Sequence, residues 1–318
     1  MQYNFVIIRT EKGRKYARKI LNSIKWINEN KYPQHDFRTA DLTIEEFLNT
    51  YFDINTLKPE NTIIHARCAN PRTEWTIKLR ELEEIGYKVV NSVDCIELTS
   101  NKLACSLHLQ GKVNHPKSWE YNANMDYEDF VNLIGNIEDS LDEPQFIIAK
   151  PLTSLEQGLN VKKIEIGAMM NYDEIRRLLD EIPRNKIVIQ EYIPYTALHR
   201  VIVIGGKALP YTFIDKPEWH NNGDWKVSCC LNRTTMKLNE NANPELLELA
   251  EKTQKEVGGT INFIDIFEVD TGESVYYTNA EINTACSLNI HERLAKEAGR
   301  LDWNIHYRIA NQLIKKIL

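Results

Sequence analysis

Residues 276–287 read YYTNAEINTACS, and residues 262–270 just upstream read NFIDIFEVD. The segment 275–278 is rich in β-forming residues and predicts a strand. Glu281 and Asn283 follow two positions apart. On an extended backbone this spacing puts both side chains on the same face of a sheet.

Asp265 lies in the apolar run upstream, and a turn signal at 270–272 separates that run from the strand. A hairpin across this turn would bring Asp265 near Glu281. Two carboxylates and the Asn283 amide on one sheet face are hard oxygen ligands, which Mg²⁺ takes together with substrate phosphates. The same residues also fit an edge strand whose acidic side chains face water, and this stretch alone leaves both interpretations open.

Composition places the chain among ordinary globular proteins. Its 318 residues suffice for two or three subdomains, and it is 42% hydrophobic and 26% charged. A net charge of -6 gives no reason to expect nucleic acid or an anionic membrane as partner. We see no signal peptide and no membrane-length apolar run, and the six cysteines have no framework spacing. We therefore expect reduced thiols and a cytoplasmic location.

Short apolar runs alternate with amphipathic stretches near the N-terminus, which predicts a small parallel α/β domain. Further along, strands separated by turn signals predominate, including a hairpin across Gly205-Gly206. The expected strands include 4–8, 61–66, 87–91, 146–150, 162–166, 186–193, 200–204 and 207–213. The expected helices include 41–51, 74–85, 100–111, 127–137, 171–182, 244–257 and 290–318, the last with an interruption near Gly299.

Three further segments suggest a nucleotide site. Lys150 ends an apolar strand, where a lysine is costly unless it faces a cavity or an anion. Gln157-Gly158 lies in a loop that could offer backbone N–H groups to a phosphate. The run from Gln190 through Glu191 and Tyr192 to Ile193 ends a strand whose backbone could bind an adenine edge. Each segment by itself also fits ordinary strand-end chemistry.

The order of these residues is more specific than any one of them. The set is Lys102, Lys150, Gln157-Gly158, Gln190-Glu191-Tyr192-Ile193, Arg200, Gly205-Gly206-Lys207, Asp265 and Glu281-x-Asn283. It resembles the ATP-grasp superfamily and, within it, the RimK-like ligases, whose namesake adds glutamate to a ribosomal protein. The resemblance covers roughly residues 60–290, and the strand ending in Glu-x-Asn is its most specific piece.

This resemblance implies an ATP-grasp fold of mixed α/β and α+β class. Residues 1–95 would form a small N-terminal parallel α/β domain. Residues 96–190 would form a central lid subdomain, and 191–318 a C-terminal, mainly antiparallel sheet with helices that carries the metal site.

The resemblance also implies a role for each matched residue. Lys102 and Lys150 would contact the phosphates of ATP beneath the Thr153–Gly158 loop, and the strand end at Gln190–Ile193 would hold adenine. Mg²⁺, with Mn²⁺ as a substitute, would be held by Asp265, Glu281 and Asn283. The implied catalytic residues and substrate contacts are Arg200 and Arg233 at the acceptor or acyl-phosphate, Lys226 near the phosphates, and Arg67 facing the substrate.

The chain departs from the family pattern at three places. The phosphate loop, 154–160, has fewer glycines than is usual. Leu198 stands where many relatives have an acidic residue two positions before the arginine. Residues 284–287 replace a proline-glycine turn, so Cys286 either borders the acceptor site or is a packing thiol.

The implied activity is ATP-dependent amide or peptide bond formation between a carboxylate and an amine, through an acyl-phosphate, with release of ADP and phosphate. The substrate would be an amino acid, a peptide or a protein, and the resemblance leaves a homo-oligomer open. The mechanism needs no side-chain nucleophile, and the sequence contains no G-x-S-x-G or papain-like cysteine segment. Two alternatives stay open: a small-metabolite ligase like glutathione synthetase or the D-alanine ligases, and a non-catalytic nucleotide-binding scaffold.

Overall fold

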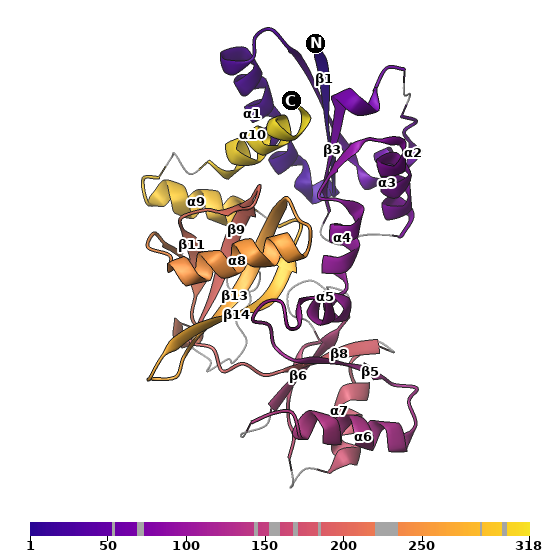
Figure 1. The fold of residues 1–318 in the computed structure, drawn as a ribbon, viewed down its shortest axis with the longest axis vertical. Coiled ribbons are helices and arrows are strands. Elements are labelled where there is room, and N and C mark those ends of the chain that lie inside the picture. Colours follow the sequence, from indigo (N-terminus) through magenta and orange to yellow (C-terminus); the bar gives the residue numbers. More distant parts are fainter. Residues whose placement is uncertain are drawn as a thin grey trace.

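The computed structural model describes residues 1–52, 55–68, 73–142, 146–152, 160–167, 171–183, 186–219, 235–286, 288–300 and 304–318. Within these ranges the strands form three sheets, stacked along the long axis of the molecule (Figure 1). Short 3₁₀ helices occur at η1 (Glu11–Gly13), η2 (Pro59–Asn61) and η4 (Pro217–Trp219). None of the helices in the described ranges is long and apolar enough to span a membrane.

The N-terminal sheet is parallel, with strand order β2-β1-β3-β4. Its strands are β1 (Gln2–Arg9), β2 (Asp36–Thr43), β3 (Thr62–Arg67) and β4 (Lys88–Val90). Its helices are α1 (Arg14–Lys31), α2 (Ile44–Asn49) and α3 (Thr73–Ile85). Phe5 and Ile7 pack toward α1 and Val6 and Ile8 toward the opposite side, so β1 is apolar on both faces as parallel strands are. The small parallel α/β domain expected from the sequence is confirmed.

One expected helix of this domain is shorter than predicted. The helix predicted for 41–51 begins only at Ile44, and the residues before it form the edge strand β2. Pairing of β2 along the whole of β1 overrides the local helical pattern. Thr43 then caps α2 in a reciprocal capping box with Glu46.

Two short helices, α4 (Val93–Ser100) and α5 (Lys102–Leu109), lead from the first sheet to the second (Figure 1). The expected helix 100–111 is shorter, because Asn101 ends α4 and caps α5. The central sheet is antiparallel with order β5-β8-β6-β7: β5 (Ser118–Asn122), β6 (Phe146–Pro151), β7 (Lys162–Glu165) and β8 (Lys186–Glu191). Two helices pack on it, α6 (Tyr127–Glu138) and α7 (Tyr172–Asp180).

The C-terminal sheet is antiparallel with order β12-β11-β9-β13-β14, and β10 pairs with β9. Its strands are β9 (Ala197–Ile204), β10 (Lys207–Ala208), β11 (Thr212–Asp215), β12 (Lys237–Asn239), β13 (Ile261–Asp270) and β14 (Val275–Asn283). The helix α8 (Pro244–Glu256) packs on one face of the sheet, while α9 (Asn289–Glu297) and α10 (Ile305–Ile317) pack on the other. The expected antiparallel C-terminal sheet with helices is confirmed.

The C-terminal helix returns to the N-terminal domain. The helices α10 and α1 lie side by side (Figure 1). Their buried residues belong to one apolar core, which also contains Phe5 and Ile7 of β1 and Phe263 of β13. The side chain of Asn91 adds a polar tie. Its Oδ1 accepts from the backbone N–H groups of Thr260 (2.7 Å) and Ile261 (2.8 Å). The first and third sheets are therefore packed together, and the central sheet extends from them through α5.

Candidate active site

The hairpin expected from the sequence is present, and a β-bulge determines where its acidic residues point. β13 and β14 pair antiparallel, with Asp265 opposite Glu281 and Ile266 opposite Asn279, so Ala280 has no opposing residue. Asn279 faces α8, where its Oδ1 accepts from Thr253 Oγ1. Because the bulge shifts the alternation by one residue, Glu281 lies on the opposite face of the sheet, together with Asp265. Without the bulge, Glu281 would lie beneath α8.

Asp265 is held by Arg200, its neighbour on the adjacent strand β9. The guanidinium donates from Nε to Oδ1 (2.7 Å) and from Nη2 to Oδ2 (2.6 Å), in the bidentate geometry of strong arginine–carboxylate pairs. Both side chains are buried. Burial raises the pKa of Asp265, and the Arg200 charge opposes that rise.

Glu281 makes a second ion pair, with a lysine from another part of the chain. Lys102 Nζ donates to Glu281 Oε1 at 2.5 Å, and the Lys102 backbone N–H donates to the carbonyl of Leu152 after β6. Burial alone would raise the pKa of Glu281, but the charges of Lys102, Lys150 and Arg200 override it and hold the pKa at about 2. The carboxylate therefore stays ionised, and α5 is tied to the central sheet as well as to β14.

Lys150 is the third cation of this group and lies at the end of β6. Burial, followed by the neighbouring Lys102 charge, lowers its pKa to about 8. Its Nζ donates to Gln190 Oε1 of the adjacent strand β8 at 2.6 Å. Three cations thus surround the two carboxylates of Asp265 and Glu281, so the cluster has a net positive charge suited to an anion.

The strand end expected to hold adenine is engaged in contacts within the central sheet. Glu191 Oε2 accepts from the Lys117 N–H at 3.0 Å. The Tyr192 ring packs edge-on against Phe146, and Lys163 Nζ lies 3.6 Å from its ring centroid. Ile193, the next residue, is buried. These contacts fix the path of the backbone as it leaves β8.

The structure brings together some of the residues singled out by the sequence and leaves others undescribed. Lys102, Lys150, Arg200, Asp265 and Glu281 form one charged cluster, and Asn283 is half-buried at the end of β14. Four of the predicted site residues lie outside the described ranges: Gln157, Gly158, Lys226 and Arg233. The rest of the predicted Thr153–Gly158 loop lies outside them as well.

One of the three departures from the family pattern, Leu198, has a structural role in this chain. Leu198 is buried in the apolar core shared with α1 and α10. The next residue, His199, lies between Thr212 Oγ1 (3.1 Å) and Glu268 Oε2 (3.2 Å). An acidic residue at position 198 would therefore be placed in an apolar environment in this chain.

Arg67 lies at the carboxyl end of β3, close to the chain segment that follows β14. Its Nη2 donates to the carbonyl of Cys286 at 2.5 Å, and its guanidinium lies 4.7 Å from the Tyr16 ring centroid. Burial lowers its pKa. The carbonyl is neutral and does not cancel the guanidinium charge. Since ligands of parallel sheets bind at the carboxyl ends of the strands, this buried cation is placed to meet an anion.

Three polar residues lie behind Lys150, in a place that the sequence did not predict for them: Ser106, His115 and Ser118. Gln190 Nε2 donates to Ser118 Oγ (3.0 Å) and Ser106 Oγ (3.4 Å), and His115 Nε2 lies 2.7 Å from Ser106 Oγ. Burial, followed by the Lys150 charge, lowers the pKa of His115 to about 3, so the ring is neutral. Their only sequence signal was small polar residues at inward positions, which is too common to single out a site.

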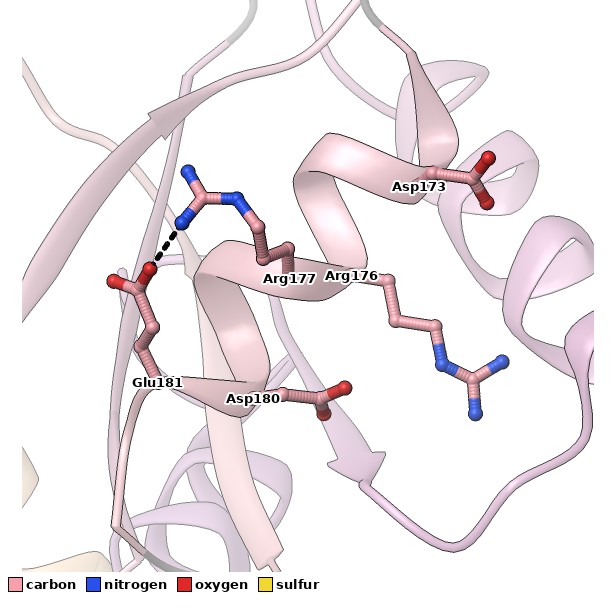
Figure 2. Close-up of a pocket in the computed structure, with 5 residues that line it drawn as sticks. All are labelled: Asp173, Arg176, Arg177, Asp180 and Glu181. Carbon is pink, nitrogen blue, oxygen red and sulfur yellow. Dashed lines mark hydrogen bonds and ion pairs between the residues drawn. The ribbon is translucent and has the colours of Figure 1, made fainter.

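A hollow in the surface lies away from this cluster, along α7 at the far end of the central subdomain (Figures 1 and 2). It is lined by Asp173, Arg176, Arg177, Asp180 and Glu181. Arg177 extends toward Glu181 along the helix (Figure 2) and also pairs with Glu174. Such pairs, three and four residues apart, are ordinary on a solvated helix surface, and we assign no function to the hollow.

A parallel N-terminal sheet followed by two antiparallel sheets, with paired lysines facing a carboxylate pair, defines an ATP-grasp protein. The family model of the RimK-like ATP-grasp domain matches residues 99–298, and the chain belongs to this family. It is therefore a member of the ATP-grasp ligases, enzymes that use ATP to form C–N bonds.

Solved structures of similar fold agree with this membership. D-cycloserine synthetase DcsG aligns with a TM-score of 0.68 at 10% identity, covering 99% of this chain and 100% of that one. ATP-grasp ligase PsnB complexed with minimal precursor, Mg and ADP gives 0.63 at 14% identity, covering 99% and 97%. D-alanine–D-alanine ligase from Bacillus anthracis complexed with ATP gives 0.60 at 13% identity, covering 100% and 97%. None of the curated proteins matches the chain in sequence.

Proposed function

We propose that this protein is an ATP-dependent carboxylate–amine ligase that activates a carboxylate as an acyl-phosphate and transfers the acyl group to an amine. The observation that supports this most directly is the charged cluster between the central and C-terminal sheets. Lys102 and Lys150 from one side meet the Asp265–Arg200 and Glu281 groups of the other. Such a cluster suits a polyanionic nucleotide between two sheets.

The nucleotide-binding residues in this proposal are those implied by the sequence. Lys102, Lys150 and Lys226 neutralise the phosphates, and Gln157 and Gly158 contribute to phosphate binding. The β8 strand end, Gln190 to Ile193, holds adenine, with its backbone at the base edge and its apolar side chains at the ring face.

The oxygen donors near the phosphates fit Mg²⁺, with Mn²⁺ as a substitute. Asp265 and Glu281 oppose each other across the hairpin, and Asn283 lies two residues along the strand. Carboxylate and amide oxygens are the donors that Mg²⁺ accepts alongside phosphate oxygens. In the free protein, Arg200 neutralises the charge of Asp265 and Lys102 that of Glu281. When bound, the ion supplies charge neutralisation at the transferred phosphoryl group.

The chemistry then needs positioning more than side-chain reactivity. The substrate carboxylate oxygen attacks the γ-phosphorus of ATP, the bond to the ADP oxygen breaks, and an acyl-phosphate forms. The amine attacks the activated carbonyl carbon, phosphate leaves, and the amine loses a proton. Arg200 and Arg233 stabilise negative charge developing on the acyl oxygen and phosphate. Exclusion of water by the closed site protects the acyl-phosphate from hydrolysis.

The substrate class in this proposal is an amino acid, a peptide or a protein. Arg67 supports it, because a buried guanidinium bonded to a neutral carbonyl is suited to a substrate carboxylate. The buried cysteines Cys68, Cys95 and Cys105 are reduced thiols, which supports a cytoplasmic location. We propose subdomain boundaries close to 1–95, 96–190 and 191–318, with the last helix returning to the first subdomain.

The test is ADP release from Mg-ATP with pooled amino acids, acidic peptides or small metabolites as acceptors, followed by intact-mass analysis of the products. A mass gain on a peptide or protein supports the proposal, while a gain on a small metabolite would assign the chain to the glutathione synthetase-like alternative. ATP binding without ADP release on any acceptor would favour a non-catalytic nucleotide-binding scaffold.

The variant Glu281→Ala tests the proposed metal site in the same assay, because it removes a proposed Mg²⁺ ligand and the partner of Lys102. We expect Mg-dependent ADP release to fall at least about 100-fold, because charge neutralisation at the phosphoryl group is lost. Glu273→Ala, in the exposed turn of the same hairpin, is the control and should keep full activity. Full turnover by folded Glu281→Ala protein would exclude Glu281 as a metal ligand.

A further inference from the structure

Lys150 is held in place by a buried chain of hydrogen bonds that leads away from the charged cluster. The chain starts at Lys150 Nζ, which donates to Gln190 Oε1 at 2.6 Å. The amide of Gln190 then donates from Nε2 to Ser118 Oγ and Ser106 Oγ. Gln190 is 4% exposed, and both serines are also buried. None of these three side chains was expected from the sequence to act on a lysine.

The directions of these hydrogen bonds fix the orientation of the Gln190 amide. Ser118 Oγ donates its own proton to the carbonyl of Pro116 at 3.2 Å, so its oxygen is an acceptor toward Gln190. Ser106 Oγ lies 2.7 Å from His115 Nε2 and 3.4 Å from Gln190 Nε2. Ser118 therefore requires the N–H side of the amide, and the Lys150 ammonium, which has only donors, requires Oε1.

A flipped amide would be costly. It would place Nε2 against the Lys150 ammonium and Oε1 against the Ser118 hydroxyl, whose proton is already donated to Pro116. A buried donor facing another donor loses its hydrogen bond and pays for its desolvation. The network is therefore satisfied in one arrangement, and a flexible lysine is held in one position.

We propose that Gln190 is a positioning residue for Lys150, and that Ser118 and Ser106 act through it to hold the ammonium where the phosphates of ATP bind. This rests on the proposed phosphate-binding role of Lys150. The Gln190 side chain then contacts the lysine, and adenine recognition is left to the backbone of the strand end, as the sequence predicts. The charged and titratable groups that face Lys150 from the surrounding elements are Lys102, Cys105, His115 and Glu281.

The experiment measures the dissociation constant of a non-hydrolysable ATP analogue with Mg²⁺ by calorimetry, so it needs no acceptor and no turnover. Ser118→Ala removes an acceptor of Gln190 without touching Lys150. We expect binding about fivefold weaker, the usual cost of one lost hydrogen bond in a buried network. Ser118→Thr keeps the hydroxyl and should restore the affinity. Ser23→Ala, whose hydroxyl bonds a backbone carbonyl on α1, is the control and should bind as the unaltered protein does.

The decisive comparison repeats Ser118→Ala in a Lys150→Met background. If Ser118 acts through Lys150, the serine change has no further effect once the lysine is gone. The positioning role is overturned if Ser118→Ala weakens binding equally in the unaltered and the Lys150→Met backgrounds, or if it does not weaken binding in the protein that has Lys150. Ser106→Ala offers the same test should Ser118→Ala fail to fold, which thermal unfolding would reveal.

The same measurements separate this inference from the proposed function. If Lys150→Met binds the analogue as tightly as the unaltered protein, the phosphate-binding role of Lys150 is wrong, and the inference falls with it. If Lys150→Met weakens binding but the serine variants do not, the nucleotide site stands and only the positioning role is excluded.

Discussion

At the scale of single residues, the lowered pKa of Lys150 predicts a pH dependence of ATP binding. Burial and the Lys102 charge lower that pKa to about 8, against 10.5 for a free lysine. Phosphates bind the ammonium and not the neutral amine. As pH rises from 7 to 9, most Lys150 in the free protein loses its proton, and the dissociation constant for Mg-ATP should rise about tenfold. Calorimetry across this pH range measures the effect.

Lys150→Arg is the control for that profile, because a guanidinium stays protonated over the whole range. We expect its ATP affinity to be nearly flat from pH 7 to 9. An equally steep profile in the arginine variant would assign the titration to another group. In the unaltered protein, the free energy of unfolding should rise with pH while the affinity for ATP falls. In the unfolded chain Lys150 keeps its proton up to about pH 10.5, whereas in the folded protein it loses the proton near pH 8. The free energy of unfolding therefore rises between about pH 8 and 10.5.

The sequence indicated which residues carry charge but not which atoms meet. Lys150 was expected to face an anion because an apolar strand tolerates a lysine poorly otherwise. The pairing of Lys102 with Glu281 was beyond prediction, since the two are 179 positions apart in the chain. The role of the Gln190 side chain depends on the directions of four hydrogen bonds, and residue types alone do not give directions.

At the scale of elements, the N-cap of α5 should matter for nucleotide binding, because α5 begins with Lys102. Asn101 Oδ1 accepts from the Ala104 N–H at 3.1 Å. Asn101→Ala should lower the free energy of unfolding by about 1 kcal/mol, the usual cost of losing an asparagine cap. It should also weaken Mg-ATP binding, since the helix end that places Lys102 then frays. Chemical denaturation and calorimetry measure the two effects.

Asn243→Ala is a matched control for this prediction. Asn243 caps α8 in the same way, with Oδ1 accepting from the Glu245 N–H at 2.9 Å, and α8 covers the face of the sheet opposite Glu281. We expect a similar loss of stability with unchanged ATP affinity. Equal affinities for the two variants would show that the cap of α5 does not position Lys102.

The hairpin could be predicted because turn residues and two β-rich runs are local signals. The bulge at Ala280 could not, because it depends on which residues of β14 fit beneath α8. The edge strand β2 was also missed. Its residues are mostly polar, and the strand it pairs with, β1, lies more than 30 positions away in the sequence.

At the scale of the whole molecule, the family resemblance predicted the order of the sheets, but it did not predict that the last helix packs against the N-terminal domain. The last helix, α10, packs beside α1 and shares one core with β1 and β13. Amphipathic patterning predicts that α10 has an apolar face, but it does not say which sheet that face covers. The N-terminal and C-terminal sheets consequently form a single packed unit, and the central sheet meets it through α5 and the charged cluster.

Asn91 links the two sheets of that unit by hydrogen bonds, so its replacement should lower the stability of the whole fold. Its Oδ1 accepts from two backbone N–H groups, and its Nδ2 donates to the carbonyl of Ile261 at 2.8 Å. The side chain is fully buried. Asn91→Ala would leave these buried backbone groups at the start of β13 without that partner, which should cost about 3 kcal/mol of unfolding free energy. Asn30→Ala, an exposed change on α1, should cost only a few tenths. Denaturant unfolding measures the free energy of unfolding of both variants. If Asn91→Ala lowers it no more than Asn30→Ala does, the apolar core alone joins the two sheets.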